Sequence, residues 1–331
     1  MYFLSYFFRV ATAVIAPDLV KDFSINPLKL GLLSSFYFYT FAVAQFFIGP
    51  LLDKKGPRKV GFSFGLIAAT GATIFAVAPN YNFSIIGRAL TGLGVSVAYM
   101  GTLKMISIWF KPNEFATMSS ISMAVGNLGA LLAAAPLAFL TGLMGWRYTF
   151  GIFGFFTIIS ALLILWLAND KYDSKAKNNE RLARTPFSNI LKNKNFLIIS
   201  FMEFAWFGGF ISIQGLWGGP FLMDVYTLSK PEAGKILGMI SVGFICGAPI
   251  IGYFSDKIIK SRKKVIIIGL SLFLVIFFII FTKKWGSTPL LFAMFFAFGF
   301  FGASGAVGYA HIKELFPPNL SGTVMSYINF F

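Results

Sequence analysis

The sequence predicts an all-α protein that crosses a membrane many times. Hydrophobic residues make up 57% of the 331-residue chain, charged residues make up only 12%, and the mean hydropathy is +0.76. In windows of about 19 residues, the chain is a series of apolar stretches that are each long enough to cross a bilayer. Polar segments rich in Lys, Arg, Gly and Pro separate them, so we expect helical spans joined by short connections.

The spans fall into two sets. Six are predicted in the first half, over residues 1–17, 27–52, 60–79, 82–108, 116–142 and 146–168. Four more are predicted over residues 196–222, 232–255, 264–282 and 288–312, and an eleventh begins near Ser321. Asn26 and Pro27 are typical of a helix cap followed by the first turn. Residues 169–195 are polar and basic, and we interpret them as a cytoplasmic linker between an N-terminal bundle (1–168) and a C-terminal bundle (196–331).

The charges predict the orientation. Most of the 28 Lys and Arg residues lie in the linker and in the connections after spans 2, 4, 8 and 10. Cytoplasmic connections of membrane proteins carry such an excess, so we place the linker and the N-terminus in the cytoplasm. The formal net charge of +16 does not indicate nucleic-acid binding, because the cations are not gathered on one face or one helix.

One short motif occurs in both halves. It spans residues 49–59 and returns, with a basic stretch after it, from residue 252 onward. We expect Gly49 to let two helices approach closely, Asp53 to pair with cations or a helix N-terminus, and Gly56 with Pro57 to close a turn. The repetition predicts two similar six-helix halves, and a substrate can be held between such halves near the bilayer midplane.

These residues resemble the major facilitator superfamily. The pattern Gly49-x-x-x-Asp53-Lys54-x-Gly56-x-Arg58-Lys59 is similar to the signature between its helices 2 and 3, and Arg88-x-x-x-Gly92-x-Gly94 is similar to its helix-4 motif. The resemblance implies twelve helices in two bundles around a cavity that opens alternately to either side, of which about ten and a half are present, so the chain looks truncated at its C-terminus. It also implies a gating role for the two motif copies, namely Gly49, Asp53, Lys54, Gly56, Arg58, Gly252, Asp256 and Lys257.

Two arginines lie within spans, where charges are costly and usually functional. Arg9 is near the midplane of the first span, and we predict that it anchors an anion by gripping a carboxylate or phosphate with two parallel bonds. The alternative is a structural arginine paired with an internal acid or with backbone carbonyls. For Arg88, the resemblance implies a part in substrate binding or proton coupling, and the alternative is a tether between helices.

The seventh span contains the other candidates. Burial disfavours the charged form of a carboxylate, so Glu203 is predicted to carry a proton; the alternative is an ionised partner of a cation such as Arg9. Gln214 and Trp217 lie among glycines and a proline that predict a break lining a cavity. We interpret both as substrate contacts, although packing roles explain the two residues equally well. Asn127 of the fifth span is a further candidate for a substrate contact in the cavity.

The favoured function is a proton-coupled carrier of a small organic anion or zwitterion, active as a monomer in the cytoplasmic (inner) membrane of a bacterium. The alternatives are a drug or multi-substrate proton antiporter and a non-transporting receptor or inactive fragment. The antiporter is disfavoured because the paired glycines of its helix-5 motif are missing after Ala135-Pro136. One His, one Cys and the lack of a nucleophile–base set predict neither an enzyme, nor a metal site, nor a cofactor.

Overall fold

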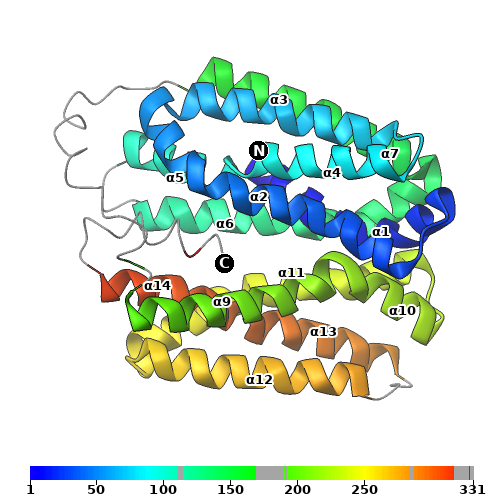
Figure 1. Ribbon diagram of the computed structural model, residues 1–331. Coiled ribbons are helices and arrows are strands. Elements are labelled where there is room, and N and C mark those ends of the chain that lie inside the picture. Colours follow the sequence, from blue (N-terminus) through cyan, green and yellow to red (C-terminus); the bar gives the residue numbers. More distant parts are fainter. Residues whose placement is uncertain (111–114, 169–189, 191, 283–286, 317–327, 329–331) are drawn as a thin grey trace. The chain divides into compact units, whose positions relative to one another are not determined.

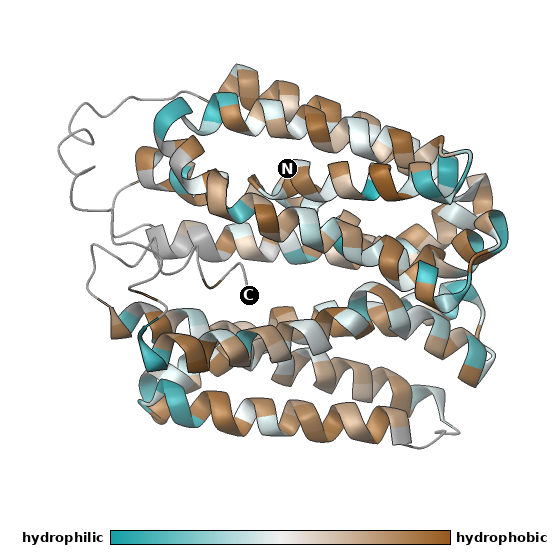
Figure 2. Ribbon diagram, viewed as in Figure 1, coloured by the Kyte–Doolittle hydropathy of each residue, from teal (hydrophilic) through white to brown (hydrophobic). Residues whose placement is uncertain are grey.

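The computed structural model describes residues 1–110, 115–168, 190, 192–282, 287–316 and 328, and the chain forms helices joined by short turns (Figure 1). This part of the chain contains no strand. Nine helical stretches within it are long and apolar enough to cross a membrane. Figure 2 shows hydrophobic residues along the helices and hydrophilic residues gathered at their ends. The predicted all-α membrane fold is confirmed.

Contacts divide the chain into two units, Met1–Tyr172 and Asp173–Phe331. In the first unit, α3 packs against α4 and α7, α1 packs against α6, and α2 packs against α4. Its helices are α1 (Tyr2–Phe23), α2 (Pro27–Lys55), α3 (Pro57–Ala76), α4 (Tyr81–Val95), α5 (Ala98–Trp109), α6 (Phe115–Leu132) and α7 (Ala135–Leu167).

In the second unit, α13 packs against both α11 and α12, and α14 packs against α9 and α12. The predicted span near Ser321 lies outside the described residues, apart from Ile328. The elements are α9 (Lys194–Ser212), the π-helical turn η2 (Ile213–Trp217), α10 (Gly218–Tyr226), α11 (Lys230–Tyr253), the π-helical turn η3 (Phe254–Ile258), α12 (Arg262–Thr282), α13 (Thr288–Gly302), the 3₁₀ turn η4 (Ala303–Gly305) and α14 (Ala306–Leu315).

Local signals define several helix ends. The Asn26 side chain accepts a hydrogen bond from the Lys29 N–H at 2.9 Å, and Pro27 occupies the first turn of α2, as predicted. Asn80 caps α4 in the same way, accepting from the Phe83 N–H at 3.2 Å. The turn predicted before residue 146 is formed by Gly145, whose φ is +79°.

Three spans that were predicted as single helices are interrupted. Residues 82–108 are divided between α4 and α5, and residues 288–312 contain the turn η4. Residues 116–142 are divided between α6, which ends at Leu132, and α7. In a continuous helix the Leu132 carbonyl would accept a hydrogen bond from the N–H of residue 136, but Pro136 has no N–H. Hydrophobic length predicts that a segment crosses the membrane, but it does not predict where the helix changes direction.

Glycines allow the closest helix crossings in both units. A side chain at Gly94 of α4 would overlap the backbone of Ala68 in α3. In the second unit, a side chain at Gly299 of α13 would overlap the carbonyl group of Ile240 in α11. Association of helices in lipid depends on such close packing, because lipid tails are as apolar as the side chains themselves.

Candidate functional site

Arg9 lies inside an aromatic cluster of the first unit. The residue is only 8% exposed. Its guanidinium carbon is 4.8 Å from the centroid of the Tyr6 ring and 5.2 Å from that of Phe41, which lies on α2. Ring faces attract cations, so these contacts help to hold a charge within the membrane. Arg9 is thus buried at the position where the sequence predicted an anion anchor, and that role stays a prediction.

Sequence reasoning missed the tyrosines beside Arg9. The Tyr2 and Tyr6 hydroxyls lie 3.3 Å apart, and the Tyr2 ring stacks on Tyr99 of α5 with 5.1 Å between centroids. Phenolic hydroxyls both donate and accept hydrogen bonds. Tyr2, Tyr6 and Arg9 follow at i, i+4 and i+7, which places them on one helix face, so the sequence carried a signal for two of the tyrosines.

Arg88 holds the turn of α1 that precedes Arg9. The side chain is 1% exposed, and Nη1 donates to the Phe8 carbonyl at 2.8 Å. The guanidinium also lies over the Tyr37 ring at 4.7 Å, and the Tyr37 hydroxyl donates to the Ser5 carbonyl at 2.9 Å. Among the described residues, Nε and Nη2 have no hydrogen-bond partner. These contacts favour the tether interpretation of Arg88.

Asn127 lies on α6, the helix that packs against α1. It is 6% exposed, and its side-chain amide donates to the Met123 carbonyl of its own helix at 3.0 Å. The approach of the two helices is close, because a side chain at Gly129 would overlap the carbonyl of Phe3. Asn127 therefore lies on a helix next to the one that carries Arg9, and its role as a substrate contact stays a prediction.

Glu203 is a buried carboxylate in the second unit. It is 2% exposed, and within the described part of the chain neither carboxylate oxygen has a hydrogen-bond partner. Gly308 of α14 faces it, and Gly305 faces Trp206 one turn further along α9. α9 and α14 therefore run antiparallel. His311 lies one turn after Gly308 on α14, which places it nearer the start of α9 than Glu203 is. A carboxylate in this environment is costly unless it is protonated or paired.

The break predicted in the seventh span is present as the π-helical turn η2. Pro220 has no N–H to donate to the Leu216 carbonyl. The Gly218 N–H donates to the Ile213 carbonyl five residues earlier, as in a π-helix. A side chain at Gly218 would overlap that carbonyl, so glycine is required. Gly208 and Gly209 do not break the helix, because both lie within continuous α9.

Gln214 and Trp217 both belong to this turn but differ in environment. Gln214 is 7% exposed and donates to the Ser241 hydroxyl of α11 at 3.1 Å. Trp217 is 38% exposed. The side-chain amide of Gln214 thus already has a hydrogen-bond partner within the second unit, which favours the packing alternative for this residue. Their predicted substrate contacts stay predictions.

The first copy of the repeated motif forms a very tight turn. Gly56 has φ +78°, and Pro57 begins α3, as predicted. Arg58 Nε donates at 2.7 Å to the Leu165 carbonyl near the end of α7, where a cation is favourable. Lys54 is exposed, and the Asp53 side chain lies outside the described residues. Among the described residues, a side chain at Gly49 would meet nothing within 4 Å, and the close approach predicted there stays a prediction.

The second copy is helical rather than a loop. Gly252 lies within α11, where an added side chain would meet no described residue within 4 Å, and η3 continues the helix to Ile258. The chain turns at Lys260, whose φ is +51°. Lys257 is exposed, and the side chain of Asp256 lies outside the described residues. Gly252 thus lies within a helix, as the predicted span 232–255 implies, and the structure continues this helix three residues further than predicted.

The whole chain, residues 1–331, matches the family model described as Major Facilitator Superfamily. The chain belongs to this superfamily. It is 21% identical over 294 residues to the probable sulfoacetate transporter of Cupriavidus necator, covering 82% of this chain and 68% of that protein. It is 22% identical over 362 residues to the probable galactarate/D-glucarate transporter of Escherichia coli K12, covering 98% and 79%.

A solved structure shows the same fold. A bacterial homologue of the human lysosomal transporter Spinster, in an inward-facing and occupied conformation, gives a TM-score of 0.74 at 19% identity. The match covers 99% of this chain and 76% of that one. The predicted family and fold are confirmed.

Proposed function

We propose that this member of the superfamily carries small organic anions across the inner membrane by alternating access, coupled to protons. The observation that carries the proposal is the Arg9 guanidinium, buried in the membrane and surrounded by aromatic rings. An arginine can bind a carboxylate or sulfonate through two parallel N–H groups. The relatives named above are probable transporters of sulfoacetate and of galactarate or glucarate, all of which are anions.

The other residues receive supporting roles in this proposal. Arg9 anchors the anionic group, the hydroxyls of Tyr2 and Tyr6 contact its remaining oxygens, and Glu203 carries the coupling proton. Asn127, Gln214 and Trp217 are proposed as further substrate contacts, and the two motif copies are proposed as gates. The N-terminus and linker are placed in the cytoplasm because of the charge asymmetry, and the working unit is proposed to be a monomer.

Ligand-dependent thermal stability of the purified chain tests the substrate class. A ligand that binds only the folded state raises its stability with concentration. We expect dicarboxylates, sulfonated carboxylates or sugar acids to raise the melting temperature. Matched neutral sugars and lipophilic cations should leave it unchanged. Stabilisation by lipophilic cations alone would contradict the proposal and favour the drug antiporter.

Arg88→Gln should affect binding and stability together. The change removes the charged hydrogen bond to the Phe8 carbonyl, which is worth about 2 kcal/mol. The turn of α1 that precedes Arg9 then loses a fixed contact, so we expect a lower melting temperature without ligand as well as weaker anion binding. Thermal shift measurements with and without the anion separate the two effects. Unchanged stability with lost binding would instead assign Arg88 to the substrate.

Glu203→Gln should uncouple transport from protons. The amide has nearly the same shape but cannot take up a proton at neutral pH. We expect uptake driven by a pH gradient to be lost in proteoliposomes, while exchange of internal for external substrate continues. η4, which packs against α9, contains no titratable residue, whereas α14 contains Tyr309, His311, Lys313 and Glu314. His311→Gln is therefore measured alongside.

The control for Glu203→Gln is Glu232→Gln. Glu232 is a carboxylate of the same unit that caps α11 by accepting from Ser229, and glutamine can take its place in such a cap. Uptake driven by the pH gradient should survive this control. The role of Glu203 is excluded if gradient-driven uptake also survives in Glu203→Gln.

A further inference from the structure

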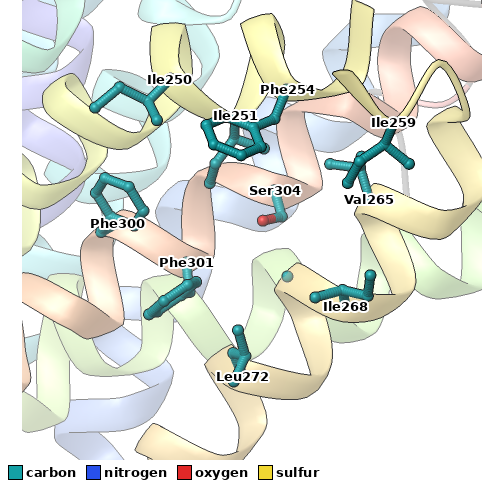
Figure 3. A pocket seen from close by; sticks show the side chains of 11 residues that line it. Ile250, Ile251, Phe254, Ile259, Val265, Ile268, Leu272, Phe300, Phe301 and Ser304 are labelled. Atoms are coloured by element: carbon teal, nitrogen blue, oxygen red, sulfur yellow. The ribbon is translucent and has the colours of Figure 1, made fainter.

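The second unit contains an apolar groove that the proposed transport function does not use. It has a volume of about 260 Å³ and lies between α11 with η3, α12, and α13 with η4 (Figure 3). Exposed apolar side chains form its rim, with exposed fractions of 45% for Ile250, 45% for Phe254, 53% for Ile268 and 40% for Leu272. All of these residues lie on membrane-spanning helices or directly after one, so the groove is suited to hydrocarbon from the bilayer.

One polar group lies in this groove. Ser304 is 0% exposed, and its hydroxyl has no hydrogen-bond partner among the described residues. Figure 3 shows its oxygen pointing into the space between the surrounding side chains. Gly269 of α12 faces this hydroxyl, and any side chain at Gly269 would overlap it. A buried hydroxyl without a partner is costly, so a ligand that offers an acceptor here is favoured over plain hydrocarbon.

One end of the groove is basic. Lys264, Ile268 and Leu272 follow at i, i+4 and i+8 on α12, which places the lysine on the helix face that lines the groove. Lys260 directly follows Ile259, another lining residue. Both lysines are exposed. Two cations therefore lie where the apolar groove meets the membrane surface.

We propose that the groove binds one anionic phospholipid from the leaflet beside the basic turn between η3 and α12. One acyl chain lies in the apolar groove, an ester carbonyl accepts a hydrogen bond from the Ser304 hydroxyl, and the phosphate lies between Lys260 and Lys264. An acyl chain gains little free energy on moving from the bilayer into an apolar groove, since both surroundings are hydrocarbon. The selectivity for an anionic lipid therefore comes from the two lysines and the hydroxyl.

Native mass spectrometry of the full chain tests this site. The protein is released from micelles that contain equal amounts of phosphatidylglycerol and phosphatidylcholine, and the retained lipids are counted. We expect one phosphatidylglycerol to be retained in preference. In Lys260→Asn/Lys264→Gln its affinity should fall about tenfold, while phosphatidylcholine binding stays unchanged. Asparagine is chosen at position 260 because it tolerates a positive φ.

The matched control is Lys55→Gln/Lys59→Gln, which removes two exposed lysines from the corresponding turn of the first unit. It should keep the retained phosphatidylglycerol. Ser304→Ala should weaken retention without altering the charge. Equal retention of the two lipids by the unaltered chain, or equal loss in the two double variants, would overturn the proposal, because general attraction to a basic surface would then explain the binding.

Discussion

Arg9→Gln should abolish uptake of the anionic substrate. Glutamine keeps a polar side chain in the aromatic cluster but removes the charge and the planar pair of N–H donors. Two charged hydrogen bonds at about 1.5 kcal/mol each correspond to a loss of roughly a hundredfold in affinity. The loss is measured as uptake of radiolabelled substrate into proteoliposomes and as the missing thermal shift on addition of the anion.

Two further variants make this result specific. Arg9→Lys keeps the charge without the forked geometry, so we expect an intermediate loss. Arg147→Gln removes an arginine whose side chain is 37% exposed and pairs with Asp22 at 2.8 Å, and it should transport like the unaltered chain. Arg9 is not the anchor if Arg9→Gln binds and transports the anion normally, and the structural alternative for Arg9 would then hold.

Gly94→Val should prevent the first unit from folding stably. The added side chain would overlap the backbone of Ala68, and backbone atoms within a packed helix cannot move aside as a flexible side chain can. Overpacking commonly costs about 1–3 kcal/mol even where side chains yield, so we expect a loss at or above the upper end of this range. Size-exclusion profiles and melting temperatures of the detergent-purified protein provide the measurement.

Gly151→Val is the matched control for this prediction. Gly151 lies within α7, and an added side chain would meet nothing within 4 Å in the part of the chain that the structure describes. Valine is a better helix former than glycine, so we expect this control to lose no stability through helix propensity. Similar melting temperatures for the two variants would show that the α3–α4 crossing adapts to a larger side chain.

Much of this fold is encoded in local sequence. Apolar length predicts the spans, because every backbone polar group in lipid must be satisfied within a helix. The cap at Asn26 and the turns at Gly56 and Gly145 follow from side-chain chemistry and backbone freedom within a few residues. The motif from Gly49 to Lys59 was sufficient to indicate the superfamily. These features depend only on near neighbours in the chain.

The candidate site depends on distant neighbours. The sequence singled out Arg9 as a charge within a span, but the Phe41 ring beside it comes from another helix. The bond from Arg88 to Phe8 joins residues 80 positions apart, so it cannot be read from the sequence either. Both contacts depend on which helix faces pack against each other. Apolar helix faces are nearly equivalent in hydrocarbon, so hydrophobicity alone does not choose the partner of a face. Small residues and buried polar groups make that choice, and they act only in the tertiary structure.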